Sequence, residues 1–397
     1  MQLHEPIEVA IIGAGTMGHG IAEVSAIAGL KVNLNDVDKK FLDNAKIKIE
    51  ESLKKLQTKN QLKESFENIA NRITYELDFQ KAVSSADLVI EAVPEKIDLK
   101  FQIFNKLDMY TKKSCILATN TSSLPITEIS SAVSDPKRVI GIHFFNPPVL
   151  MKLLEIIKGK YTAEETVNIA TNFSNELGKK YVIVNKDVPG FIVNRLLVRF
   201  MSTARLMVEH GMASIEEIDS SLKYRAGLPM GVFELADYIG LDVIYFVERA
   251  LSERGFPVPI DHLLESKVKE NNLGMKNGSG FYVYDKNKPR AIISEELSSK
   301  VPASLVLSPA INEASWLLAN DVATKDDIDT STVLGLGFQK GLLRMADEWG
   351  IDSIIENLEQ LRERLHMDWL EPHPILHKMK NEVRLGQKTG SGFYNYI

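Results

Sequence analysis

The sequence predicts an α/β domain built on a parallel, doubly wound sheet, followed by two tandem all-α domains. Three observations predict this. Short apolar runs alternate with helical patterns in the first half of the chain. A Gly-x-Gly-x-x-Gly loop follows the first apolar run. Amphipathic helical patterns dominate the second half, where they occur twice. We therefore expect domains over residues 1–186, 187–289 and 290–397.

The first domain shows its strands as short apolar runs that end at loops. The expected strands cover residues 7–12, 31–35, 87–93, 115–119, 138–142 and 181–184. Helical stretches separate most of them, which is typical of a doubly wound sheet. Residues 39–70 are long for one crossover, and their apolar residues recur at helical spacing. We expect a projecting helical pair there, with a break near Lys59 and Asn60.

The second half repeats itself at an offset of 110 positions. The first set of residues is Ile218, Asp219, Gly227, Gly231, Asp237, Gly240 and Asp242, and the second is Ile328, Asp329, Gly337, Gly341, Asp347, Gly350 and Asp352. A Lys-x-Gly-Ser-Gly-Phe-Tyr-x-Tyr segment also occurs twice, at 276–284 and 388–396. Two tandem helical domains explain this repetition. The polar segment 285–290 contains a proline and is expected to be a linker.

Composition excludes several classes of protein. The 397 residues are 44% hydrophobic and 25% charged, with a net charge of −6 and no basic block, so a nucleic-acid partner is not expected. We expect no membrane span and no signal peptide at Met1–Pro6. The single cysteine, Cys115, lies in an apolar run and fits a reducing compartment, so we expect a cytoplasmic protein. His373 and His377 have a metal-ligand spacing, but Pro374 and the lack of a third ligand argue against a metal site.

The glycine loop, Gly13-Ala14-Gly15-Thr16-Met17-Gly18, lies between an expected strand and an apolar helix. The first glycine permits a tight turn, the second permits close approach of a pyrophosphate, and the third lets helix pack on strand. Asp36, at the end of the second strand, is suited to bind ribose hydroxyls and would repel a 2′-phosphate. These residues predict a Rossmann-type domain that binds NAD rather than NADP. Asp36 could alternatively be a simple loop or helix-cap acid.

His143 ends an apolar strand, and Glu155 lies in the apolar run Leu153–Ile157. A carboxylate in such a run needs a partner, because burial without one is costly. An imidazole is a suitable partner, since the carboxylate fixes its tautomer and stabilises the imidazolium. The pair could be a general base with its orienting acid, or a purely structural pair.

Four segments together resemble the L-3-hydroxyacyl-CoA dehydrogenase family. They are Asn120-Thr121-Ser122-Ser123-Leu124, His143-Phe144-Phe145-Asn146-Pro147, Pro189-Gly190-Phe191-Ile192-Val193-Asn194-Arg195-Leu196 and Leu228-Pro229-Met230-Gly231-Val232-Phe233-Glu234-Leu235-Ala236-Asp237. The resemblance implies oxidation of a (3S)-3-hydroxyacyl-CoA by NAD, or the reverse, within fatty acid β-oxidation. His143 would be the general base, oriented by Glu155, while Ser122 and Asn194 would hold the 3-oxygen and the thioester end. It implies cofactor contacts by Thr16, Met17, Glu95, Lys100, Asn120 and Asn146, and contacts with CoA by Ser52 and Lys59.

The second helical copy departs from this pattern. At the offset of 110 it places Ser304 opposite Asn194, and no histidine-bearing strand precedes it. We expect it to lack catalysis and to cover the first copy, giving a monomeric pseudo-dimer or a further homodimer. Two alternative functions remain: a dehydrogenase of a small hydroxy acid such as gulonate, and a non-catalytic NAD-binding or structural relative. A separate question is whether this chain is one part of a fusion with an enoyl-CoA hydratase.

Overall fold

A computed structural model describes residues 7–259, 261–285 and 290–396. The segment 1–6 and four residues of the expected linker, 286–289, lie outside this range. The chain forms two compact units, Met1–Val188 and Pro189–Ile397, which are described separately.

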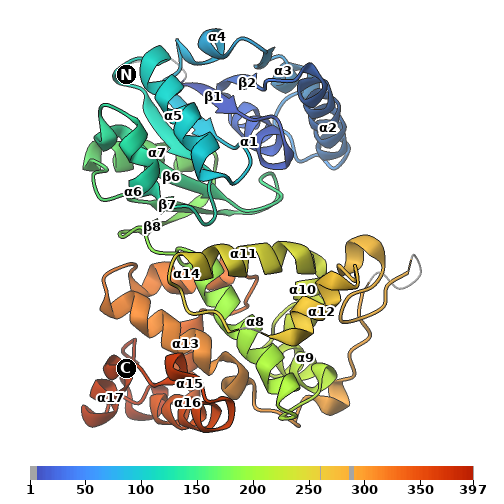
Figure 1. Ribbon diagram of the computed structural model, residues 1–397, viewed down its shortest axis with the longest axis vertical. Helices are drawn as coiled ribbons and strands as arrows, with labels where there is room; N and C mark the ends of the chain where they lie inside the picture. The colour runs from blue at the N-terminus through green and yellow to red at the C-terminus, as the bar shows by residue number, and fades with distance from the viewer. Residues whose placement is uncertain (1–6, 260, 286–289, 397) are drawn as a thin grey trace. The chain divides into compact units, whose positions relative to one another are not determined.

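The first unit contains a sheet of eight strands (Figure 1). Their spatial order is β3-β2-β1-β4-β5-β6-β7-β8. The bounds are β1 (Glu8–Ile12), β2 (Lys31–Asn35), β3 (Ile73–Glu76), β4 (Leu88–Glu91), β5 (Ile116–Thr119), β6 (Val139–Phe144), β7 (Leu153–Ile157) and β8 (Lys180–Val184). Strands β1 to β6 are mutually parallel. Because the strand order reverses on either side of β1, right-handed crossovers place helices on both faces of the sheet. The expected doubly wound sheet is confirmed.

Two features of the sheet were not expected. Strand β3 was absent from the sequence-based assignment because Ile73-Thr74-Tyr75-Glu76 is an edge strand with one fully buried residue. Strand β7 runs antiparallel to β6, while β8 is parallel to β7, so the last two strands reverse the sheet. The short connection from Phe145 to Lys152 contains no helix to act as a crossover, and it allows only a hairpin-like return.

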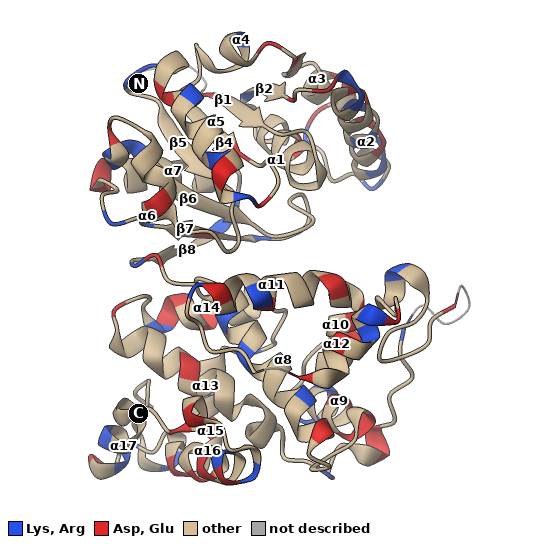
Figure 2. Ribbon diagram, in the orientation of Figure 1, with Lys and Arg blue, Asp and Glu red and all other residues tan. Residues whose placement is uncertain are grey.

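Seven α-helices accompany this sheet within residues 7–188. They are α1 (Thr16–Ile27), α2 (Lys39–Thr58), α3 (Phe66–Ala70), α4 (Phe79–Val83), α5 (Ile97–Tyr110), α6 (Ile126–Ile129) and α7 (Glu164–Glu176). Residues of α1, α2 and α7 share one apolar cluster with alternate residues of the strands. The segment 39–70 contains α2 and α3, and the chain turns between them at Asn60, where φ is 54°. Both lysines and acids occur along α2, as the blue and red bands of its ribbon show (Figure 2).

The second unit consists of helices in two successive sets. The first set is α8 (Val193–Glu209), α9 (Ile215–Tyr224), α10 (Val232–Ile239), α11 (Leu241–Glu253) and α12 (His262–Lys269). The second set is α13 (Ala303–Ala319), α14 (Lys325–Gly335), α15 (Leu342–Trp349), α16 (Ile351–Leu365) and α17 (Pro374–Asn381). We call residues 189–285 the first helical half and residues 290–396 the second. Helices α8 and α13 lie side by side (Figure 1).

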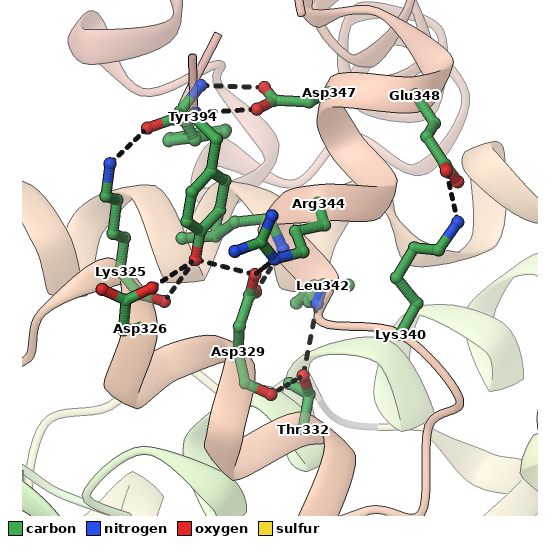
Figure 3. Close-up of polar contacts among 12 residues, drawn as sticks. Lys325, Asp326, Asp329, Thr332, Lys340, Leu342, Arg344, Asp347, Glu348 and Tyr394 are labelled. Carbon is green, nitrogen blue, oxygen red and sulfur yellow. Dashed lines mark hydrogen bonds and ion pairs between the residues drawn. The ribbon is translucent and has the colours of Figure 1, made fainter. Parts of the chain in front are cut away.

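Buried aspartates tie each helical half together at the repeated positions. In the second half, Asp329 accepts a hydrogen bond from the Leu343 amide at 2.7 Å. It also accepts from the Tyr394 hydroxyl at 2.9 Å (Figure 3). Asp347 accepts from the amides of Phe393 and Tyr394 at 2.8 and 2.9 Å. These bonds join the helices to the tail segment at 388–396.

The first half has the same ties. Asp219 accepts from the Phe233 amide and the Tyr282 hydroxyl, and Asp237 accepts from the Phe281 amide. A Cβ at Gly231 would lie only 2.1 Å from Cγ of Asp219, so no other residue fits there. The repeated aspartates and glycines are therefore structural.

Within the described residues, the structure has no helix long and apolar enough to span a bilayer.

Candidate active site

The predicted site residues of the first unit follow the carboxyl ends of parallel strands. The glycine loop follows β1, Asp36 follows β2, Glu95 lies beyond β4, Asn120 follows β5, and His143 is close to the end of β6. Carboxyl ends of parallel strands share one edge of a sheet, where doubly wound proteins bind their ligands at the reversal of strand order. The fold thus collects these residues at a single edge.

The glycine loop has the geometry that dinucleotide binding requires. Gly13 has a φ of 102°, a conformation that other residues rarely adopt. A Cβ at Gly18 would lie 1.7 Å from the carbonyl oxygen of Gly13, so α1 can begin this close to β1 only with glycine. A Cβ at Gly15 would meet nothing within 4 Å. The space beside Gly15 is open, and Gly15 precedes the first turn of α1, where backbone amides can receive a phosphate. Thr16 and Met17 are the first residues of this helix.

Asp36 is joined to the glycine loop. Its Oδ2 accepts a hydrogen bond from the Ala14 amide at 2.8 Å, and its Oδ1 accepts from the Asp38 amide at 3.2 Å. Each carboxylate oxygen can accept a further bond. Asp36 therefore shapes the loop and keeps acceptor capacity for ribose hydroxyls.

Glu95 and Lys100 belong to a polar network, buried at Lys100 and more exposed at Glu95, that the sequence did not reveal in full. Lys100 is 1% exposed, and its Nζ donates to both oxygens of Glu91 at 2.7 and 2.8 Å. It also lies 3.3 Å from Glu95. Glu91 went unnoticed, although a carboxylate in an apolar strand is the same signal that singled out Glu155. The Lys100 ammonium is buried and lies beside the carboxylates of Glu91 and Glu95. Lys100 can therefore contribute to cofactor binding indirectly, by holding Glu95 in place.

Glu95 in turn holds the Thr121–Ser123 loop. It accepts from the Thr121 hydroxyl, from the amides of Ser122 and Ser123 at 3.0 and 3.1 Å, and from the Ser123 hydroxyl at 3.0 Å. Burial opposes ionisation, but Lys100 and these donors outweigh it and hold the pKa of Glu95 below its usual value. Ser122 is thus fixed through its backbone on the loop after β5.

The loop after β6 is held by two further contacts. The side-chain oxygen of Asn120 accepts from the Phe144 amide at 2.8 Å. Buried Lys179 donates from Nζ to the carbonyl oxygens of Pro148 and Met151, at 2.6 and 2.5 Å. Burial lowers the pKa of Lys179 to about 8. Asn146, on this loop, is exposed. Lys179 was not predicted, because only the folded chain shows its carbonyl partners.

His143 and Glu155 lie directly opposite each other on antiparallel strands β6 and β7. The Nδ1 of His143 is 2.7 Å from Oε2 of Glu155, and the two residues are 6% and 0% exposed. The carboxylate accepts a hydrogen bond from Nδ1–H, which leaves Nε2 as the nitrogen whose lone pair can accept a proton. Burial strengthens this interaction, because little water screens it. The pair has the form of a base and its orienting acid.

Asn194 belongs to the second unit. It lies in the first turn of α8, directly after the turn at Gly190 and Phe191, where φ is 77° and 53°. Its surroundings are described within the second unit alone.

The two residues expected to touch CoA lie on α2. Ser52 is half-buried and Lys59 is exposed at the C-terminal end of the helix. Glu23 of α1 is 2% exposed. Burial raises the pKa of Glu23 to about 7, and the influence of Ser52 only partly opposes this.

His373 and Cys115 lie in structural surroundings. No group of three or more metal-ligating side chains occurs among the residues that the structure describes. His373 caps α17, accepting from the Ile375 amide at 3.3 Å. Cys115 is buried, which raises its thiol pKa to about 12.

Comparisons with known proteins identify both kinds of domain. Residues 8–188 match the NAD binding domain of 3-hydroxyacyl-CoA dehydrogenase, and residues 190–284 and 303–396 match its C-terminal domain. The human mitochondrial hydroxyacyl-coenzyme A dehydrogenase is 42% identical over 285 residues, which are 70% of this chain and 90% of that protein. A probable 3-hydroxybutyryl-CoA dehydrogenase of Deinococcus radiodurans is 40% identical and covers 70% of this chain and 100% of its own.

The solved structure of 3-hydroxybutyryl-CoA dehydrogenase from Escherichia coli superposes with a TM-score of 0.86. Its identity is 28%, and the match covers 96% of this chain and 99% of that one. With both kinds of domain matched and relatives above 40% identity, this chain is a member of the 3-hydroxyacyl-CoA dehydrogenase family, with the NAD-binding domain of that family at its N-terminal end.

Proposed function

We propose that this protein oxidises (3S)-3-hydroxyacyl-CoA to 3-ketoacyl-CoA with NAD, or catalyses the reverse reaction. The observation that carries the proposal is the buried pair of His143 and Glu155 at the edge of the sheet that also carries the glycine loop and Asp36. In the oxidation direction, Nε2 of His143 takes the hydroxyl proton while Glu155 stabilises the imidazolium. NAD, when bound, supplies the hydride acceptor.

The other site residues bind and orient. Ser122 and Asn194 hold the 3-oxygen and the thioester end of the substrate. The residues assigned to the cofactor are Gly13, Gly15, Thr16, Met17, Gly18, Asp36, Glu95, Lys100, Asn120 and Asn146, with Lys100 acting through Glu95. Ser52 and Lys59 contact the CoA moiety. The open space beside Gly15 and the anchored loop that carries Ser122 support these assignments.

The direct test is NADH formation with 3-hydroxybutyryl-CoA and with a longer homologue, compared between the native protein and His143→Ala. General-base catalysis contributes about 10²- to 10⁴-fold, so the variant should lose turnover by that factor while still binding NADH. Near-normal turnover of His143→Ala would refute the mechanism. Turnover of gulonate in place of the thioesters would favour the small-acid alternative, and NADH binding without turnover of either class would favour a non-catalytic role.

We further propose that the two helical halves are copies of one domain, at 187–289 and 290–397, after an NAD-binding domain at 1–186. The aspartate ties and the matching helix orders support this. The second half covers the first within one chain, so a monomer is the simplest state, and a further homodimer is the alternative. Sedimentation of the full chain separates the two.

The family relationship supports a place in fatty acid β-oxidation, where an enoyl-CoA hydratase forms the 3-hydroxyacyl-CoA. Pull-down of a hydratase would support such a partner. The free, buried Cys115 supports a reducing compartment such as the cytoplasm. Fractionation of cells tests this location.

A further inference from the structure

Two arginines near the start of α8 are enclosed by aromatic rings. The Arg195 guanidinium lies 4.5 Å from the ring centroid of Phe256 and 4.1 Å from that of Trp316. The Arg199 guanidinium lies 4.2 Å from Phe256 and 4.3 Å from Trp369. We call these five residues the arginine ladder. Arg195, Arg199 and Phe256 belong to the first helical half, and both tryptophans belong to the second. Stacking of this kind fixes a guanidinium plane between two rings.

Glu313 of α13 pairs with both arginines of the ladder. It accepts a hydrogen bond from Nε of Arg195 through Oε1, and it accepts from Nε and Nη2 of Arg199 through Oε2, at 3.0 and 2.9 Å. The two arginines are 7% and 3% exposed, and Glu313 is 8% exposed. Removing the carboxylate would leave two like charges buried one helical turn apart, which is strongly unfavourable.

The ladder is attached to the turn that presents Asn194. The Arg195 amide donates to the Gly190 carbonyl at 3.0 Å, and its Nη1 donates to the Pro189 carbonyl at 3.4 Å. Side chain and backbone of Arg195 therefore both hold the 189–195 turn, and Asn194 is the residue directly before Arg195. A displacement of the Arg195 side chain should therefore displace this turn and Asn194 with it.

We propose that Glu313, supplied by the second helical half, is a positioning residue for Asn194. It acts through Arg195 to fix the first turn of α8, and so the half without catalytic groups still sets the substrate affinity. The inference rests on the proposed role of Asn194 in substrate binding.

The test is a double-mutant cycle in the full-length protein with Glu313→Gln and Asn194→Ala, assayed by acetoacetyl-CoA reduction with NADH. Glu313→Gln should raise the KM for acetoacetyl-CoA about 10-fold and leave the KM for NADH unchanged. In the Asn194→Ala background the same change should alter kcat/KM by less than about 2-fold, because the two residues act on one contact. Glu248→Gln is the control, since Glu248 pairs with buried Arg205 farther along α8. It should leave both KM values unchanged.

If the two substitutions act independently, the loss of kcat/KM in the double variant equals the product of the losses caused by Glu313→Gln and Asn194→Ala. That result would refute the role of Glu313 while leaving that of Asn194 intact. A silent Asn194→Ala would refute both. If Glu313→Gln does not fold, Trp316→Leu replaces it, because this change keeps the ion pairs but removes one stacking ring from Arg195. It should raise the KM for acetoacetyl-CoA about 3-fold, again only when Asn194 is present, and an unchanged KM would overturn the proposal.

Discussion

Replacing Glu155 with glutamine tests whether the buried carboxylate activates His143 or merely packs beside it. The change keeps the shape and one acceptor oxygen but removes the charge. In the structure this charge lies 2.7 Å from Nδ1, and neither residue is appreciably exposed. A hydrogen bond to a charged group is worth about 1.5–3 kcal/mol, and each 1.36 kcal/mol is a factor of ten in rate. Loss of the imidazolium's partner in the transition state should thus lower kcat about 10- to 150-fold.

The assay is NADH formation from 3-hydroxybutyryl-CoA at saturating NAD. The KM for NAD should stay within about 2-fold of the native value, because Glu155 does not belong to the glycine loop. Unfolding in denaturant provides the control for general damage to β7. A well-folded Glu155→Gln protein with native kcat would refute the role of the carboxylate and favour a structural pair.

Three other changes test separate parts of the molecule. Asp36→Ser should narrow the preference for NAD over NADP by removing charge repulsion, measured as the ratio of kcat/KM for the two cofactors, and comparable efficiency of the native protein with both would contradict the assignment. Glu23 has a pKa raised to about 7, so its protonated form favours folding at low pH and this contribution is lost as the pH rises to about 7. The unfolding free energy of Glu23→Gln, taken relative to that of the native protein, should therefore rise by about 2–3 kcal/mol between pH 5 and pH 8. If denaturant titrations give the same difference at both pH values, the pKa of Glu23 is not raised. Deleting residues 290–397 should expose α8 and cause aggregation or dimerisation in light scattering, whereas a fully active monomer would show that the second half is dispensable.

Local sequence patterns predicted most of the first unit. The glycine loop is recognisable because its requirements are steric and lie within six residues. The pairing of His143 with Glu155 was inferred because a carboxylate in an apolar strand must find a partner. The same reasoning applied to Glu91 would have indicated Lys100, nine residues farther on, as its partner.

Contacts between distant segments could not be predicted in this way. The reversal of the sheet at β7 depends on the path of one short connection, and Lys179 donates to the backbone carbonyls of Pro148 and Met151, which carry no signal in the side-chain pattern. The pair of Arg195 and Glu313 spans 118 positions, and nothing in either local sequence specifies the other. Such contacts depend on how helices pack, which periodicity alone does not determine.

The arginine ladder also has a consequence for symmetry. In a two-fold dimer of identical subunits every interface contact occurs twice, so a mutation changes both sides at once. At the offset of 110 positions, Leu305 corresponds to Arg195 and Thr203 to Glu313, and these two residues cannot form a reciprocal ion pair. Joining both halves in one chain allows each face to specialise separately. The interface can thus place both arginines on the half that bears Asn194 and their carboxylate on the other half, an arrangement that a symmetric dimer could have only in duplicate.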